Sequence, residues 1–288
     1  AGILEHLEPA GVHSGDSTAV ITPYSVDEEM LKEIEEKSKK LALGLNVKGL
    51  LNIQFAIKDE ELFILEANPR ASRTMPFVAK VTGNQIIKAG TLLMLGYSID
   101  EVRNKTNYLS SSSNKVAIKK AIFPWSRFPA EDTMLGPEMK ATGEVLGVGK
   151  EFGTALNKAY AAAGVEINNK EKGIFVTLSD SEKPNFIQTV NKYLELGFTL
   201  YSTEGTGKFL KTNGIDSVIV GKADDLGQTS LTIIEDKLVS LVINTPTYAN
   251  ELSDGWKIRR LSHETGVAVV SSVREADAFI EAFLNQNL

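Results

Sequence analysis

The residues best suited to chemistry gather first on a predicted β-hairpin over residues 49–67. Glu66 and Asn68 stand two positions apart, and because strand side chains alternate, both project from one face. Folding the hairpin about Asp59–Glu61 brings Gln54 opposite Glu66, to within about a residue of register. Carboxylate and amide oxygens suit hard cations such as Mg²⁺ and Mn²⁺. The hairpin therefore predicts a cation site shared with nucleotide phosphates.

Two arginines follow this set directly. Arg70 and Arg73 carry guanidinium groups that are well placed to hold an anion, such as a phosphoryl group beside the cation. The alternative interpretation is a hairpin with a solvated polar face, followed by a turn at Asn68-Pro69. The spacing by itself leaves both interpretations open.

A second cluster is the glycine-rich run Gly11–Ser17. Its glycines let the backbone approach a ligand closely, and His13 and Ser14 can donate to phosphate or ribose oxygens. A surface turn rich in turn-forming residues is the alternative interpretation.

A third cluster is Tyr201–Thr206, which lies between a predicted strand and a predicted helix. Parallel sheets bind ligands at the carboxyl ends of their strands, and helix N-termini favour anions. Thr203 and Thr206 add hydroxyl donors to this turn. Corresponding strand-end or loop positions carry Lys183, Lys222 and Asn244. An ordinary helix cap at Thr203 with scattered solvated lysines is the alternative interpretation.

The elements that must position these residues follow two patterns. Before about residue 166, we expect a helix that begins at a Ser25–Glu28 capping box and ends at Gly44, helices at 84–95 and 152–163, a loop at 104–115 and a strand at 116–123. After it, strands at 174–178, 198–201, 217–220, 239–243 and 267–270 alternate with helices at 184–196, 205–212, 229–236 and 273–285. This alternation predicts an α/β fold, with a parallel sheet covered on both faces.

Composition narrows the class of protein. The 288 residues suggest two domains, and the absence of cysteine excludes a disulfide scaffold, a zinc–thiolate site and a cysteine nucleophile. A net charge of −6 argues against general binding to nucleic acid or to an anionic membrane. No apolar run approaches the roughly 18 residues that span a bilayer, and the N-terminus lacks the features of a signal peptide. We therefore expect a cytoplasmic protein; the missing initiator Met suggests a fragment.

Six segments in chain order carry a family resemblance: Glu5–Ser17, Asn52–Ala56, Leu65–Thr74, Leu135–Gly147, Val242–Thr245 and Ile258–Arg260. Together they closely resemble the large subunit of carbamoyl phosphate synthase. The resemblance implies that residues 1–165 are the C-terminal part of the second ATP-grasp domain, an α+β unit with an antiparallel sheet. It implies that residues 166–288 form a doubly wound, methylglyoxal-synthase-like allosteric domain.

The resemblance also implies an activity, the ATP-dependent phosphorylation of carbamate within a glutamine-hydrolysing ligase. The family's ATP contacts match Gly11, Val12, His13, Ser14, Gln54 and Glu66. Its metal ligands match Gln54, Glu66 and Asn68, for Mg²⁺ or Mn²⁺ with K⁺ as a further candidate. Arg70 matches an arginine that touches the transferred phosphoryl group, which makes it the catalytic candidate. The implied partners are a glutaminase small subunit and further large subunits, in arginine or pyrimidine biosynthesis.

Regulation is implied at the third cluster. Nucleotide effectors of the UMP or IMP type would be held by Lys183, Thr203, Thr206, Lys222 and Asn244. Pro246 stands where the family pattern has another Thr, so the identity of the effector stays open. The alternative is a chain that acts only as an effector-binding module, without catalysis.

Ornithine regulation is where the sequence departs from the family. Two acidic contacts are retained as Glu8 and Asp16, but a third carboxylate is replaced by Lys120 and a tyrosine by Val269. A lysine places positive charge where the ornithine ammonium would bind. We therefore predict weak or no activation by ornithine.

Overall fold

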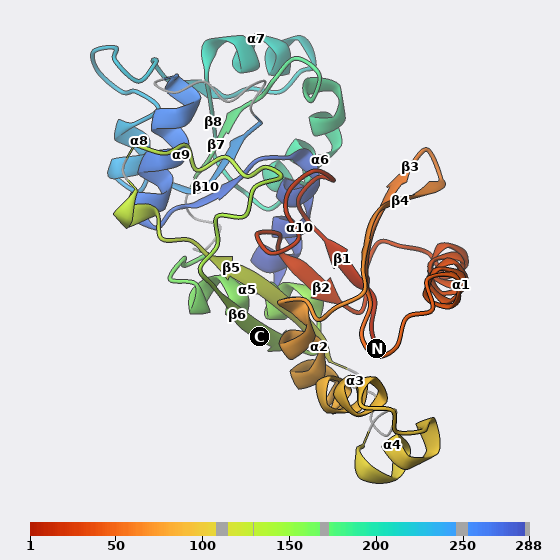
Figure 1. The fold of residues 1–288 in the computed structure, drawn as a ribbon. Helices are drawn as coiled ribbons and strands as arrows, with labels where there is room; N and C mark the ends of the chain where they lie inside the picture. Colours follow the sequence, from red (N-terminus) through yellow and green to blue (C-terminus); the bar gives the residue numbers. More distant parts are fainter. Residues whose placement is uncertain (108–114, 129, 168–172, 246–252, 286–288) are drawn as a thin grey trace. The chain divides into compact units, whose positions relative to one another are not determined.

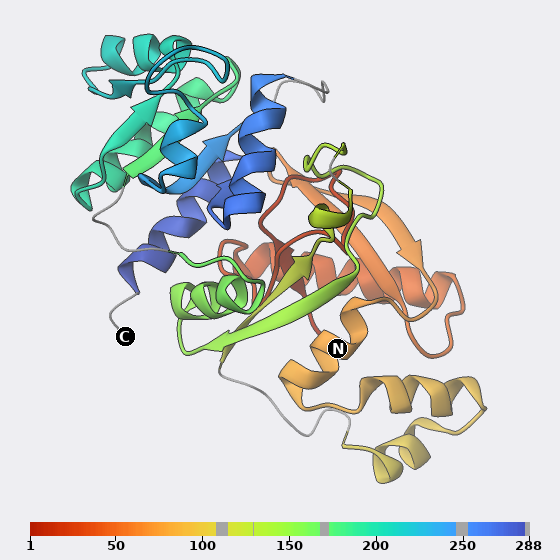
Figure 2. The same ribbon diagram turned by 90° about the vertical axis from the view of Figure 1, so that its left-hand side faces the viewer.

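The computed structural model describes residues 1–107, 115–128, 130–167, 173–245 and 253–285. The chain folds as two compact units. The first comprises Ala1–His6 and Ala19–Ala117, and the second comprises Leu7–Thr18 and Ile118–Leu288. The elements of each unit can be followed in Figure 1 and, after a quarter turn, in Figure 2. The predicted domain boundary between residues 165 and 166 divides the chain differently and stays a prediction.

The first unit consists of short strands, one long hairpin and helices. The first two strands pair antiparallel, with Leu4 opposite Ile21. Its elements are β1 (Leu4–His6), β2 (Ala19–Ile21), α1 (Glu28–Gly44), β3 (Asn52–Lys58), β4 (Glu61–Asn68), α2 (Thr74–Thr82), α3 (Ile86–Met94) and α4 (Ile99–Lys105).

The start of α1 corrects one expectation. Its N-cap is Asp27, whose Oδ1 accepts a hydrogen bond from the Met30 amide at 2.8 Å. The predicted capping box at Ser25 is wrong, because the amide and the hydroxyl of Ser25 both donate to the carboxylate of Glu5. A capping box does form at α4, between Ser98 and Glu101, where no helix was predicted from the sequence.

The predicted hairpin is confirmed as β3 and β4, which pair antiparallel. Asp59 and Glu60 form its turn with φ of 51° and 64°, as a two-residue turn that follows the twist of the strands requires. The predicted loop at 104–115 falls mostly on residues 108–114, outside the described residues.

The second unit contains the segment Leu7–Thr18 and continues within β5 (Val116–Ile122), most of which belongs to it. Beside β5 lies β6 (Gly143–Gly149), and α5 (Phe152–Ala162) packs on β6. This packing is close, since a Cβ on Gly147 would lie 2.1 Å from the carbonyl oxygen of Ala155. A short 3₁₀ turn, Trp125–Arg127, follows β5.

A five-stranded parallel sheet forms the rest of the second unit and confirms the predicted α/β class. Its strand order is β11-β10-β7-β8-β9, and all its described pairings are parallel. Its elements are β7 (Gly173–Thr177), α6 (Lys183–Glu195), β8 (Leu200–Ser202), α7 (Glu204–Thr212), β9 (Val218–Ile219), α8 (Thr232–Glu235), β10 (Val239–Asn244), α9 (Asp254–Thr265), β11 (Ala268–Val270) and α10 (Val273–Leu284).

Helices cover both faces of this sheet. On one face, Phe175 and Val242 pack with Ile233 of α8 and Ile258 of α9 in a buried cluster. On the other, α6 and α10 are in contact through an aromatic group that includes Tyr193 and Phe283. A strand buried on both faces explains why these strands read as continuous apolar runs.

Helix α9 is absent from the sequence-based expectations, and its composition explains why. Its buried positions include Arg259, Arg260 and Ser262 beside Ile258, so the buried face lacks the apolar periodicity by which a helix is recognised. Among the described residues, no helix has both the length and the hydropathy needed to span a bilayer.

Candidate functional site

The hairpin of the first unit aligns the predicted metal ligands as expected. Gln54 pairs directly with Glu66, and Asn52 pairs with Asn68, so Glu66 and Asn68 lie on one face of β4. The register shifts after Gln54, where Phe55 pairs with Ile64, so the irregularity lies beyond the predicted ligands. One carboxylate and two amides in this arrangement are oxygen donors that fit a hard cation bound together with phosphate.

Arg70 follows the hairpin in a tight turn. Its amide donates to the Asn68 carbonyl at 2.8 Å, and its Nη1 donates to the Ala71 carbonyl at 3.0 Å. The side chain is exposed, so its remaining N–H groups can reach an anion. Within the part of the chain that the structure describes, no three His, Asp or Glu side chains group as a metal site. The predicted set is of another kind, since it consists of one carboxylate and two amides.

The glycine-rich run lies in the second unit, and His13 has a defined tautomer there. The amide of Gly15 donates to His13 Nδ1 at 3.0 Å. A backbone N–H can only donate, so in the neutral ring the proton resides on Nε2. His13 thus presents an N–H donor to any ligand it faces, and it is not arranged as a base through Nδ1.

This run is held by residues far along the chain. The His13 amide donates to the Gly136 carbonyl at 2.8 Å, and the fully buried Asp16 accepts from the amides of Lys140 and Ala141 at 2.8 and 2.9 Å. Lys119 Nζ donates to the carbonyls of Ser14 and Gly15 at 3.1 and 3.3 Å. The loop conformation is therefore imposed by tertiary contacts.

The parallel sheet brings the five predicted effector residues to one edge. They follow or end four strands at their carboxyl ends: Lys183 after β7, Thr203 and Thr206 after β8, Lys222 after β9 and Asn244 at the end of β10. This edge is where a doubly wound sheet binds ligands.

The contacts of these five residues differ. Thr206 Oγ1 is buried and accepts from the Leu178 amide at 3.1 Å, with Thr203 Oγ1 at 3.4 Å. Lys183 pairs with Asp180 at 2.5 Å, and the exposed Lys222 helps to lower the pKa of Glu204, after the larger effect of Lys208.

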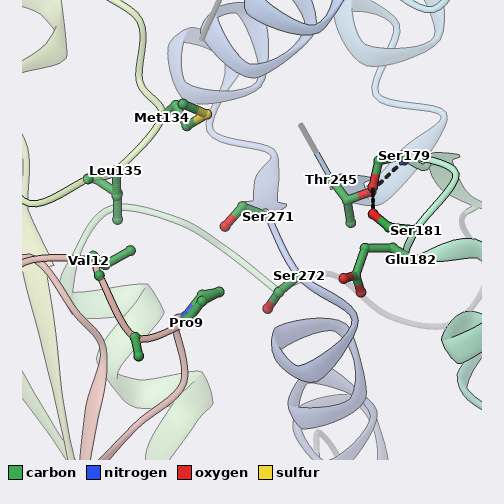
Figure 3. A pocket seen from close by; sticks show the side chains of 13 residues that line it. Pro9, Val12, Met134, Leu135, Ser179, Ser181, Glu182, Thr245, Ser271 and Ser272 are labelled. Atoms are coloured by element: carbon green, nitrogen blue, oxygen red, sulfur yellow. Dashed lines mark hydrogen bonds between the residues drawn. The ribbon is translucent and has the colours of Figure 1, made fainter. Parts of the chain in front are cut away.

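A cavity of about 340 Å³ opens beside β7 and β10, where the strand order reverses. Figure 3 shows Ser179, Thr245 and Ser271 on one side and Val12 and Leu135 on the other. The Ser179 amide donates to Thr245 Oγ1 at 2.8 Å. Gly11 and Val12, predicted for ATP, line this cavity, whereas the five effector residues do not. The serines of this cavity were not among the predicted site residues, because they form no spaced motif in the sequence.

A buried charge cluster lies near the same loop. Lys120 Nζ donates to Thr18 Oγ1 at 3.2 Å, and the amide and hydroxyl of Thr18 donate to Glu8 at 2.6 and 2.7 Å. Burial, followed by the charge of Glu275, raises the pKa of Glu8 to about 7, although Lys120 and Thr18 oppose this. Burial also raises the pKa of Tyr160 to about 12, so its hydroxyl stays protonated.

Lys120 stays charged in this cluster. Burial acts to lower its pKa, but Tyr160, Glu8 and Glu275 face it and together raise the pKa above its ordinary value. Glu8 and Lys120 stand out in the sequence, whereas Tyr160 and Glu275 do not, because they lie on α5 and α10, far from both in the chain.

Comparisons with known proteins agree with this architecture. Residues 4–102 match the family model described as "Carbamoyl-phosphate synthase L chain, ATP binding domain", and residues 185–271 match the "MGS-like domain". Relatives called "Carbamoyl phosphate synthase large chain, C-terminal section" include one from Aquifex aeolicus, 40 % identical over 97 % of this chain and 54 % of its own length. One from Methanocaldococcus jannaschii is 39 % identical over 97 % of this chain and 46 % of its own.

A third relative, the carbamoyl phosphate synthase large chain of Archaeoglobus fulgidus, is 42 % identical over 98 % of this chain but only 26 % of its own length. The chain thus spans about half the length of the first two relatives and about a quarter of the third. These matches confirm the resemblance seen in the sequence and the ATP-grasp and MGS-like parts of the fold. The chain belongs to the family of carbamoyl phosphate synthase large chains and combines an ATP-binding segment with an MGS-like domain.

Proposed function

We propose that this chain serves in a glutamine-hydrolysing carbamoyl phosphate synthase, where it takes part in the ATP-dependent phosphorylation of carbamate. The observation that carries the proposal is the direct pairing of Gln54 with Glu66, with Asn68 on the same face of the hairpin. These three side chains would hold Mg²⁺ or Mn²⁺, with K⁺ as a further candidate. When bound, the cation supplies charge that neutralises the phosphate oxygens of ATP.

The remaining roles follow from donor chemistry. Arg70, exposed after the hairpin, would neutralise the transferred phosphoryl group through its free N–H groups. His13, with its proton on Nε2, and Ser14 would donate to nucleotide oxygens, while Gly11 and Val12 would let the backbone approach them. Phosphoryl transfer needs little covalent help, so positioning and positive charge are sufficient roles for these groups.

Partners and pathway are part of the same proposal. A glutaminase small subunit would supply ammonia, large subunits would self-associate, and the enzyme would serve arginine or pyrimidine biosynthesis in the cytoplasm. The section alone, without the rest of a large chain, would not turn over. Domains at 1–165 and 166–288 would be the catalytic and the allosteric part.

The test is ATP synthesis from carbamoyl phosphate and ADP, assayed in the large chain that contains this section. We expect Glu66→Ala to lower this rate at least about 100-fold, because the sole carboxylate of the cation set is lost. Thermal unfolding should be unchanged, since Glu66 is exposed.

The matched control is Glu61→Ala at the other end of β4, where exposed Glu61 pairs with Lys58 beside the turn. It should keep the wild-type rate. A Glu66→Ala enzyme that retained the rate would disprove the metal assignment.

A second candidate, a purely regulatory module, is favoured by the gathering of Lys183, Thr203, Thr206, Lys222 and Asn244 at one sheet edge. Both candidates include binding of a nucleotide such as UMP or IMP, with Thr203 and Thr206 as donors to its phosphate. They differ in catalysis: metal-dependent ATP binding favours the ligase, and its absence together with nucleotide binding favours the module. Thr206→Ala should abolish UMP or IMP binding, and Thr206→Ser should retain it.

A further inference from the structure

Helix α9 carries a buried arginine whose guanidinium group joins two parts of the second unit. Arg259 is 4 % exposed. Its Nε and Nη2 donate to the two carboxylate oxygens of Asp132 at 3.1 and 2.6 Å, and its Nη1 donates to Asn244 Oδ1 at 2.6 Å. A rigid guanidinium fork fixes the relative position of both partners in a way that a single ammonium group does not.

Asp132 begins what we call the bridging segment, residues 132–141. Lys140 Nζ donates to the carbonyls of Asp132 and Met134 at 3.0 and 3.4 Å, which closes the segment on itself. The Asp132 side chain is only 10 % exposed, so its pair with Arg259 is shielded from water. Arg259 is therefore bonded, through Asp132, to a segment whose two ends are bonded to each other.

The far end of the bridging segment holds the glycine-rich run. Gly136 accepts from the His13 amide at 2.8 Å, and the amides of Lys140 and Ala141 donate to Asp16. Met134 and Leu135 also line the cavity, together with Val12 (Figure 3). Gly136 and Gly11 belong to the same lining. One continuous set of short contacts thus connects Asn244 to His13.

We propose that Arg259 is a positioning residue that transmits ligand occupancy at Asn244 to the His13 loop, through Asp132 and the bridging segment. The inference rests on the proposed function, in which Asn244 contacts an effector nucleotide and His13 contacts ATP. A ligand that bonds to the Asn244 amide alters the hydrogen bond between Asn244 and Arg259. Binding at Asn244 is coupled to the His13 loop only if the ligand has different affinities for two arrangements of Arg259 and the bridging segment.

The test uses the intact enzyme with UMP and IMP as probes. Asp132→Asn weakens the link to the bridging segment but leaves the bond between Arg259 and Asn244. We expect calorimetric dissociation constants within about threefold of the wild type, while the nucleotide-induced change in KM for ADP falls to a ratio of about one. Arg259→Lys should also abolish the nucleotide-induced change in KM, because an ammonium group cannot reproduce the fork, but it alters the bond to Asn244 as well, so Asp132→Asn is the variant that separates coupling from binding.

Lys257→Ala is the control on the same helix, since it removes the ion pair between Lys257 and the exposed Asp224 and leaves Arg259 in place. It should keep the wild-type response. An Asp132→Asn enzyme that binds nucleotide and retains the wild-type change in KM would overturn the coupling. If the wild-type enzyme bound neither UMP nor IMP, the proposed effector site would be overturned, and the coupling with it.

Hydrogen exchange gives a readout that needs no variant. In the wild-type enzyme, saturating UMP or IMP should change exchange at the amides of His13 and Ala141, which donate across the bridging segment. Nucleotide binding with unchanged exchange at both amides would also overturn the coupling.

Discussion

The ammonium nitrogen of Lys120 lies 4.7 Å from the centroid of the Tyr160 ring, inside the second unit. The same nitrogen donates to Thr18, which in turn donates to Glu8. A buried cation that faces an aromatic ring and a carboxylate is stabilised where a lone buried charge would not be. Four predictions follow from this cluster and from the packing around it.

Ornithine should bind weakly or not at all. Lys120 already places a cation beside Glu8, and a second ammonium group would be repelled there. Calorimetric titration of the intact enzyme should give no saturable heat. In Lys120→Ala, which removes the resident cation, ornithine should bind more tightly than in the wild type. Micromolar binding to the wild type would contradict this account.

Glu8 should make stability depend on pH. Its folded pKa of about 7 lies above the ordinary 4.5, so its contribution to stability is complete below pH 4.5 and is lost as pH rises to about 7. The difference between the two pKa values corresponds to about 3 kcal/mol in the free energy of unfolding. The free energy of unfolding in urea should be measured from pH 4.5 to 8. The value for Glu8→Gln should increase relative to the wild-type value as pH rises, whereas the difference between the exposed Glu36→Gln and the wild type should stay constant.

His263 should make stability depend on pH in the direction opposite to Glu8. Burial, aided by nearby positive charges, lowers its pKa to about 3, so its contribution to stability is present above pH 6.5 and is lost as pH falls. His263→Phe keeps a ring against Trp125 but cannot be protonated. As pH falls from 6.5 to 5, the free energy of unfolding of the variant should rise by about 2 kcal/mol relative to that of the wild type. A constant difference between the two across this range would show that His263 is not held neutral.

The contact between α5 and α10 should not tolerate a methyl group at Gly153. A Cβ there would lie 2.0 Å from the Glu281 carbonyl oxygen, which is backbone and cannot move independently. Gly153→Ala should lower the free energy of unfolding by at least about 2 kcal/mol. Gly205→Ala, in α7 with nothing within 4 Å, should be neutral or stabilising by up to about 1 kcal/mol. Equal thermal midpoints for the two variants would refute the close approach.

The hairpin and the parallel sheet could be predicted because their signals are local. Alternating side chains and a short polar turn predicted that Gln54 lies opposite Glu66 to within about a residue, and the observed pairing of the two residues confirms it. Apolar runs separated by helical patterns predicted the five strands. The start of α1 could not be predicted this way, since Ser25 bonds to Glu5, twenty residues earlier, and leaves the cap to Asp27.

What the sequence by itself determined is the α/β class and, to within about a residue, the hairpin register, because both depend on residue types at short, regular spacing. The family was implied by the resemblance of six segments spread along the chain. Only the tertiary structure decided the partners of buried polar groups. Arg259 meets Asp132 across 127 positions, and Lys120 meets Thr18 across 102. The physical reason is that a buried charge must find a partner wherever the fold brings one within reach, and no local spacing encodes that partner.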